Sequence, residues 1–404
     1  MVAPDREIDT IGPPGTGAEH ELLLGLARTC QDERTVNRLR TLLDQTVDWP
    51  HLLQLAVHHR VLPLVYQSLQ RAFPGLAPAD VMQALQQQYM NIAQRNLLLI
   101  SALKEQIDFL DQQGVCAIPY KGPTTALLVY RNLGLRQFGD IDILVYPKDY
   151  GPTRELLLAS GYRLHDDFGW ECSVVDDSRG ICIDLHRSLT PEIFPVRLDF
   201  ASLVKRLEPL TIAAGRDINV LCAEDMFLVL CVQLAKDGWG EGPLRLSKIC
   251  DIAELLRTHP RMDWEQVFNE AERLGCRRMI ALALTVSQQL LNAPAPETVM
   301  SRARADRQSN ILARYIYHDL FQEGDDRADA LLSEEDFHFI LRERWRDKLY
   351  PHYHAVRLRL TPNELDRAVL TLPDSLDALY YLIRPLRVAR DYARLLFKKM
   401  RKVR

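Results

Sequence analysis

Two aspartates separated by one residue are the side chains in this sequence best suited to chemistry. Asp140 and Asp142 flank Ile141 in the segment 138–145, whose last three residues are apolar. Because alternate side chains of a strand share a face, both carboxylates should project to one side of a strand and Ile141 to the other. Such a pair offers hard oxygen ligands of the kind Mg²⁺ prefers. An edge strand that carries two solvated acids is the alternative.

A third acid, Asp184, lies in a second predicted strand over residues 181–186. It shares a strand face with His186, while the apolar residues between them face the core. We expect Asp184 to complete a site with Asp140 and Asp142, as a metal ligand or base. Two metal ions there would activate an attacking oxygen and stabilise a leaving pyrophosphate. His186 either assists acceptor binding or proton transfer, or is a polar residue at a strand end.

A glycine turn that opens a helix precedes these strands. Lys121, Gly122 and Pro123 form the turn, and Thr124 and Thr125 begin the helix. A helix N-terminus presents free N–H groups and the positive end of its dipole, which suits a phosphate. Gly122 lets the backbone come close, and the two threonines add hydroxyl donors. Lys121 is placed to contact a phosphate or the charge that develops on it. The alternative is an ordinary turn that binds no phosphate, which could have the same sequence.

The elements around these residues divide the 404-residue chain into five predicted parts. Residues 1–18 form a flexible tail without the basic start and apolar core of a signal peptide. Helical periodicity covers residues 19–113, and short strands, turns and helices alternate over residues 114–221. Helices return over residues 222–292, and a helical region with a basic end occupies residues 293–404. The predicted fold is therefore α+β, with a small mixed-sheet core between helical N- and C-terminal regions.

Composition limits the classes of function. The net charge of −4 gives no general attraction to nucleic acid, and no stretch of the sequence is apolar for long enough to span a membrane. We therefore expect a cytoplasmic protein without a transmembrane segment or a nucleic-acid substrate. The basic end, over residues 384–404, could contact membrane lipid, RNA or an acidic partner, or could be a solvated tail.

One basic residue close to the acids belongs to the same hypothesis. Arg136 lies four residues before Asp140. We expect it to point into the cleft, where it would pair with a phosphate or balance the acids. A structural salt bridge to Asp140 or Asp142 is the alternative.

The order of these features resembles that of nucleotidyltransferases of the DNA polymerase β superfamily. The order comprises the Lys-Gly turn, a helix, Arg136, the Asp-Ile-Asp strand, a helix that ends at Gly161, and the segment Ile183-Asp184-Leu185-His186. Over most of residues 49–290 the chain is more narrowly similar to a bacterial family labelled uncharacterised nucleotidyltransferase. That family occurs in some natural-product and exopolysaccharide gene clusters.

The resemblance implies a polymerase β-like core that transfers a nucleoside monophosphate from an NTP, with ATP the expected donor and two Mg²⁺ ions as cofactors. It also implies that the helical region containing Lys248 walls the cleft and selects the nucleobase or the acceptor, a small molecule or a peptide or protein. A solvated helix face is the alternative for Lys248.

One departure from the superfamily concerns the turn. Gly-Gly or Gly-Ser is usual where this chain has Gly122 and Pro123. Proline removes both a hydroxyl and an N–H donor. Either Thr124 and Lys121 substitute, or triphosphate binding is weak or lost. In the second case the chain would be a catalytically inactive adaptor that recognises a peptide, a glycan intermediate or a partner enzyme.

Overall fold

The computed structural model describes residues 17–212, 215, 217–237, 244–321 and 333–361, and also residues 379–382, 384, 385, 387 and 390. The chain divides into two compact units. The larger comprises Met1–Glu192 and Val196–Glu343, and the smaller comprises Ile193–Pro195 and Arg344–Arg404. Most of the predicted N-terminal tail, residues 1–16, and much of the basic end, including residues 391–404, lie outside the described residues.

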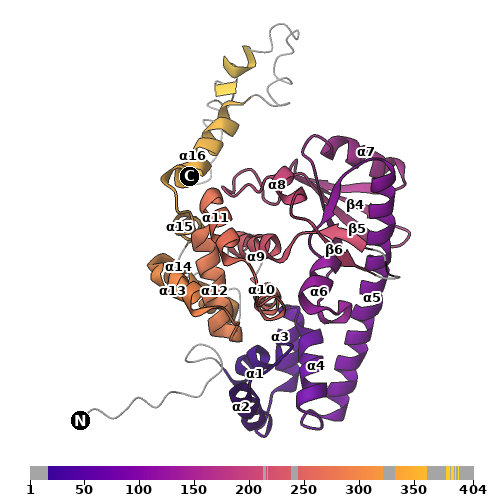
Figure 1. Cartoon of the computed structure of the whole chain (residues 1–404), viewed down its shortest axis with the longest axis vertical. Helices are drawn as coiled ribbons and strands as arrows, with labels where there is room; N and C mark the ends of the chain where they lie inside the picture. Colours follow the sequence, from indigo (N-terminus) through magenta and orange to yellow (C-terminus); the bar gives the residue numbers. More distant parts are fainter. Residues whose placement is uncertain are drawn as a thin grey trace, which may run out of the picture. The chain divides into compact units, whose positions relative to one another are not determined.

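The N-terminal region of the larger unit is helical, as predicted, and appears in indigo and purple in Figure 1. Asp48 caps the third helix, because its side chain accepts a hydrogen bond of 3.0 Å from the His51 N–H. The fifth helix is 34 residues long and ends just before Gly114, whose φ of 73° stops the helix. These helices are α1 (Ala18–Leu26), α2 (Glu33–Leu43), α3 (Trp49–His58), α4 (Leu62–Ala72) and α5 (Ala79–Gln112).

A mixed five-stranded sheet follows, again as predicted. Its order is β1-β2-β5-β4-β3, in which β2 and β5 are parallel and the other neighbours are antiparallel. The strands are β1 (Ala117–Pro119), β2 (Asp140–Val145), β3 (Arg163–Asp167), β4 (Glu171–Asp176) and β5 (Ile181–His186). The connecting elements are α6 (Pro123–Tyr130), η1 (Leu133–Leu135), α7 (Tyr150–Ala159), α8 (Phe200–Val204) and the hairpin β6 (Glu208–Thr211) and β7 (Asp217–Val220).

The core lies between this sheet and the C-terminal half of α5. Ile141, Ile143 and Ile183 are fully buried there, together with Leu99 and Leu103 of α5. These isoleucines alternate with the acidic residues of β2 and β5, so burial of one strand face turns the acids to the other face.

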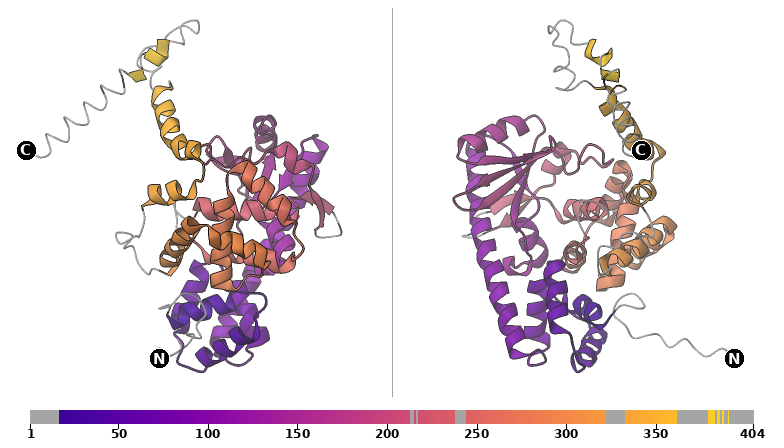
Figure 2. Two further views of the ribbon diagram at one scale, coloured as in Figure 1. Left: turned by 60° about the vertical axis from the view of Figure 1, so that its left-hand side comes forward. Right: turned by 180° about the vertical axis from the view of Figure 1, so that it is seen from behind.

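The helices after the sheet form the other side of the larger unit. Helix α10 packs against both α6 and α9, which brings this half beside the sheet-bearing half (Figure 2). Residues 292–296 form the non-helical connection between α12 and α13. The helices are α9 (Ala223–Asp237), α10 (Leu246–Thr258), α11 (Trp264–Leu274), α12 (Arg277–Leu291), α13 (Glu297–Ala305), α14 (Arg307–Phe321) and α15 (Glu334–Leu341).

The smaller unit contains α16 (Trp345–Leu360) and short helical stretches between residues 379 and 390. Across the described part of the chain, no helix combines the length and the apolar character needed to cross a bilayer.

Candidate active site

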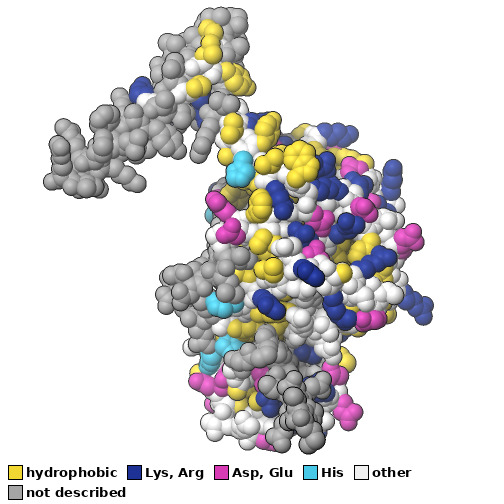
Figure 3. Space-filling view, turned by 90° about the vertical axis from the view of Figure 1, so that its left-hand side faces the viewer, with side chains coloured by type: hydrophobic (Ala, Val, Ile, Leu, Met, Phe, Trp, Pro, Cys, Tyr) yellow, Lys and Arg dark blue, Asp and Glu magenta, His cyan; other side chains and the backbone are white. Residues whose placement is uncertain are grey.

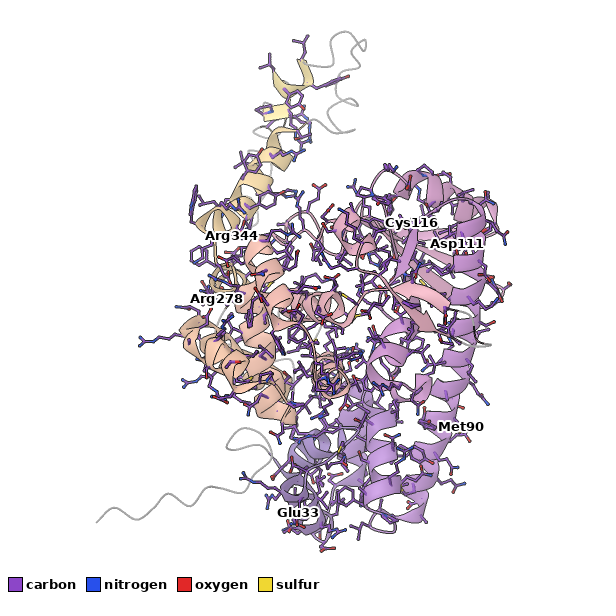
Figure 4. The ribbon with its side chains drawn as sticks, in the orientation of Figure 1. Glu33, Met90, Asp111, Cys116, Arg278 and Arg344 are labelled. Carbon is purple, nitrogen blue, oxygen red and sulfur yellow. The ribbon has the colours of Figure 1, made fainter. Side chains whose placement is uncertain are left out.

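The three predicted aspartates lie in one pocket of about 310 Å³ within the larger unit. Residues from the glycine turn, β2, β4, β5, α9 and α10 line it, and side chains from the strands and the helices occupy the space between them (Figure 4). The register of the parallel strands places Asp142 beside Asp184, and Asp140 beside Cys182. Oxygen atoms of Asp142 and Asp184 and a ring nitrogen of His186 lie within 4.8 Å of one another. This spacing is compatible with a shared metal ion.

Asp142 is the most strongly held of the three acids. Its Oδ1 lies 3.0 Å from Lys121 Nζ and 3.2 Å from His186 Nε2. Burial favours the neutral carboxyl, but the charge of Lys121 and the hydrogen bond from His186 outweigh it and hold the pKa of Asp142 well below its usual range. Asp142 is therefore ionised and fixed in position.

Asp140 has the opposite environment. Burial, and then the charges of Asp142 and Asp184, raise the pKa of Asp140 to about 6, and Lys121 and Arg136 only partly oppose them. Asp184 accepts a hydrogen bond of 2.6 Å from the Ser173 hydroxyl, a neutral donor. The pocket thus gathers three carboxylates with incomplete compensation by cations. Hard oxygen donors with surplus negative charge fit a divalent cation such as Mg²⁺.

A fourth carboxylate, from Glu171, was not predicted from the sequence. Glu171 pairs in register with His186 across β4 and β5, and its Oε2 lies 3.2 Å from His186 Nδ1, although the two are not aligned as a hydrogen bond. His186 is 1% exposed and lies between Glu171 and Asp142. The alternation of side chains along a strand could have indicated Glu171, because Glu171 and Ser173 share the β4 face opposite to buried Cys172.

The glycine turn has a geometry that explains its Gly-Pro sequence. Gly122 has φ 53° and ψ −121°, and the Thr124 N–H donates to the Lys121 carbonyl over 3.2 Å. These are the features of a type II′ turn, whose second residue needs positive φ and whose third residue can be proline. A Cβ on Gly122 would lie 2.7 Å from the carbonyl oxygen of Asp140. Glycine therefore lets the turn touch the strand that carries the acids.

The two threonine hydroxyls have other partners than the phosphate predicted from the sequence. Thr124 and Thr125 are fully buried. Thr124 Oγ1 donates to the Lys121 carbonyl over 2.8 Å, and Thr125 Oγ1 donates to the Tyr120 carbonyl over 3.4 Å. Because short side chains at a helix start readily bond to nearby backbone, both hydroxyls stabilise the turn instead of facing the pocket.

Comparison with known proteins agrees with this geometry. Residues 45–292, more than half of the chain, match the sequence model of a family described as uncharacterised nucleotidyltransferase. This protein belongs to that family. Its five-stranded mixed sheet with helical flanks is the nucleotidyltransferase core expected from the sequence. A search of curated proteins found no match.

Two solved structures are similar to parts of this nucleotidyltransferase family member. One is the lincosamide antibiotic adenylyltransferase LnuA with lincomycin bound, at 17% identity, covering 38% of this chain and 93% of that chain, with a TM-score of 0.29. The other is an antigenic nucleotidyltransferase-like protein from Paracoccidioides brasiliensis, at 15% identity, covering 50% of this chain and 96% of that chain, also with a TM-score of 0.29.

Arg136 lines the pocket of this nucleotidyltransferase, but its partner is different from those predicted. Its Nε lies 3.0 Å from both oxygens of Asp251 on α10, and its Nη2 lies 3.0 Å from Oδ2. The Tyr130 hydroxyl also donates to Asp251 over 2.8 Å. The salt bridge expected with Asp140 or Asp142 is therefore made with a residue on the opposite wall. Asp251 ties the loop before β2 to α10.

Lys248 of α10 lines the same pocket and forms an ion pair with Asp237 of α9. Burial lowers the pKa of Lys248, and nearby Lys236 and Lys121 add to this effect, while Asp237 opposes it. Lys236 and Arg60 also line the pocket, and Arg60 was not predicted because it lies in a turn 61 residues before Lys121. The helical wall thus carries two lysines together with Asp237 and Asp251, opposite the acidic residues of the sheet.

Proposed function

We propose that this protein transfers a nucleoside monophosphate from an NTP, with ATP the expected donor, to an acceptor hydroxyl or phosphate in a Mg²⁺-dependent reaction. The observation that carries the proposal is the convergence of Asp140, Asp142 and Asp184 beside the Gly122 turn in one pocket. Membership of a nucleotidyltransferase family supports the reaction class.

The three aspartates are the proposed metal ligands. Bound Mg²⁺ would supply charge neutralisation and polarisation of phosphate oxygens. Asp142 is the fixed ligand, because Lys121 and His186 already hold its carboxylate. Asp140 and Asp184 place two further carboxyl groups beside it in the pocket. We assign His186 to positioning Asp142, since both of its ring nitrogens face carboxylates and its side chain is buried.

Phosphate binding is assigned to the Gly122 backbone and to Lys121, which line the pocket together. A backbone N–H and an ammonium group are both suitable phosphate partners, and neither needs the hydroxyls of Thr124 and Thr125. Arg136, whose Nε and Nη2 are engaged by Asp251, adds positive charge to the pocket.

Acceptor binding is assigned to the helical wall, where Lys248 and Lys236 lie. The proposed acceptor is a small molecule or a peptide or protein side chain, and the proposed reaction is a step of a biosynthetic pathway. Lysine ammonium groups suit an acceptor that carries oxygen-rich or anionic groups.

Nucleotide affinity tests the proposal without knowledge of the acceptor. We expect ATP to bind the full-length protein in the presence of Mg²⁺, with at least tenfold weaker binding in EDTA or in the Asp140→Asn and Asp142→Asn variants. Asp166→Asn is the matched control, because Asp166 is an exposed acid on β3 of the same sheet. Equal ATP affinity in all these proteins would reject the proposed site.

A second function is favoured by the turn itself. Both threonine hydroxyls are used by the turn backbone, Pro123 has no N–H, and Lys121 is paired with Asp142. A protein with this phosphate-binding half could act as an inactive adaptor for a peptide, a glycan intermediate or a partner enzyme. Absence of ATP binding at millimolar nucleotide, with and without Mg²⁺, is the result that would favour this function.

A further inference from the structure

The smaller unit carries an apolar stripe on the surface of α16. Trp345, Leu349, Tyr353 and Val356 are 75%, 53%, 61% and 53% exposed. Their spacing of four, four and three residues places them on one face of a helix. Four large apolar side chains at such exposure on one helix face are unusual for a surface that meets only water.

The remainder of the described smaller unit repeats this character. Leu379, Tyr381 and Leu382 are 41%, 56% and 68% exposed, and the sequence continues with arginines at positions 384, 387 and 390. On the face turned to the viewer in Figure 3, hydrophobic and basic side chains lie close together on this unit.

Charge distinguishes the smaller unit from the rest of the chain. Residues 344–404 contain fifteen Lys and Arg against six Asp and Glu, in a protein whose net charge is −4. The rest of the chain is therefore strongly acidic. On α16, Arg346 and Arg357 are exposed, each adjacent in sequence to a stripe residue. A positively charged unit with an apolar helix face is complementary to a surface that is both anionic and apolar underneath.

We propose that α16, through its Trp345–Val356 stripe and flanking arginines, binds the surface of an anionic phospholipid bilayer. The aromatic residues suit the headgroup level, where Trp and Tyr place a ring between apolar and polar layers. Leu349 and Val356 favour a bilayer over single-stranded RNA, because aliphatic side chains insert among acyl chains but do not stack on bases. The attachment is peripheral and does not depend on nucleotidyl transfer.

Vesicle co-sedimentation of the full-length protein tests this directly. We expect the protein to pellet with phosphatidylcholine vesicles that contain one third phosphatidylglycerol, and to stay in the supernatant with phosphatidylcholine alone. High salt should release it. Replacement of both Arg346 and Arg357 by glutamine should weaken partitioning on the order of 25-fold, at about fivefold per arginine.

The stripe has its own variant and control. Leu349→Ser with Val356→Ser should abolish pelleting, whereas Met90→Ser with Leu97→Ser, which removes two exposed apolar side chains of α5, should not. Trp345 fluorescence should shift to the blue on anionic vesicles, and this shift should be absent in Trp345→Phe. Circular dichroism shows whether each variant is folded.

Three outcomes overturn the proposal. They are equal pelleting with neutral vesicles, pelleting that survives the Leu349 and Val356 substitutions in a folded protein, and absence of lipid binding. RNA binding without lipid binding would assign the basic unit to a polyanion instead. ATP affinity measured in the same preparations separates these results from any failure of the proposed catalytic site.

Discussion

Substitution of Gly122 by alanine should damage both the fold and the nucleotide site. Gly122 has φ 53° and ψ −121°, a region that L-residues other than glycine rarely enter, and holding alanine there costs about 1–3 kcal/mol. The added Cβ would lie 2.7 Å from the Asp140 carbonyl oxygen, so either the turn or the start of β2 must move by roughly half an ångström. That overpacking costs about 1–3 kcal/mol more.

The two costs are partly offset in the unfolded chain. Alanine leaves the unfolded chain fewer backbone conformations than glycine does, and this favours the folded state by about 0.4–1 kcal/mol. We therefore expect Gly122→Ala to lower the free energy of unfolding by about 1–5 kcal/mol. Because a 1 Å misplacement of reacting groups costs about a hundredfold, a half-ångström shift beside Asp140 should weaken Mg²⁺-dependent ATP binding or turnover on the order of tenfold.

Urea denaturation followed by circular dichroism gives the stability change, and ATP titration gives the functional change. Gly151→Ala is the matched control, because Gly151 lies in α7 without positive φ and a Cβ there would meet nothing within 4 Å. That variant should be unchanged or slightly more stable, since alanine is favoured over glycine in a helix. A Gly122→Ala protein as stable and as active as the wild type would refute the explanation of the turn.

Four further predictions follow from the charges. Asp140→Asn should stabilise the protein by up to about 3 kcal/mol at pH 8. The gain should fade as pH falls from 6 towards 4, because a carboxyl with a raised pKa destabilises the fold only when ionised. Asp142→Asn should instead destabilise the protein by about 3 kcal/mol, because Lys121 and His186 lose their anionic partner. Urea denaturation at several pH values distinguishes the Asp140 and Asp142 variants. Equal effects of the two substitutions would contradict the environments assigned to the two aspartates. Asp251→Ala should cost about 3–5 kcal/mol by leaving the Arg136 guanidinium unpaired, and a double variant with Arg136→Met should recover much of that loss in the same assay. Millimolar Mg²⁺ at about ten times its Kd should stabilise the wild type by about 1.4 kcal/mol in thermal denaturation, and no stabilisation is expected in EDTA or in Asp140→Asn.

The fold could be predicted in outline because its signals are local. Polar and apolar residues alternate in segments 140–145 and 181–186, which predicts two strands with the acids on one face. The structure has strands over the same residues. The helical N-terminal region and the Asp48 cap also follow from nearby residues. The mixed sheet and the family were likewise evident in the order of the motifs.

The details of the site required contacts between distant segments. Glu171 joins His186 only because β4 and β5 pair in one particular register, and a shift of one residue would turn it to the other face. Arg136 and Asp251 are 115 residues apart in the chain, and they meet only because α10 packs against α6. No local sequence pattern indicates which of several acidic residues will pair with a given arginine.

The sequence by itself determined the chemistry that is available: two aspartates on one strand face, a third on another strand, and a glycine turn before them. Periodicity and residue type are enough for this, because a strand repeats every two residues and positive φ selects glycine. Only the tertiary structure decided how those groups are used. It paired ionised Asp142 with Lys121 and left Asp140 with a raised pKa. It also directed the threonine hydroxyls to the turn backbone and paired Arg136 with Asp251. The physical reason is that burial and pairing energies depend on neighbours that chain folding brings together from far apart in the sequence.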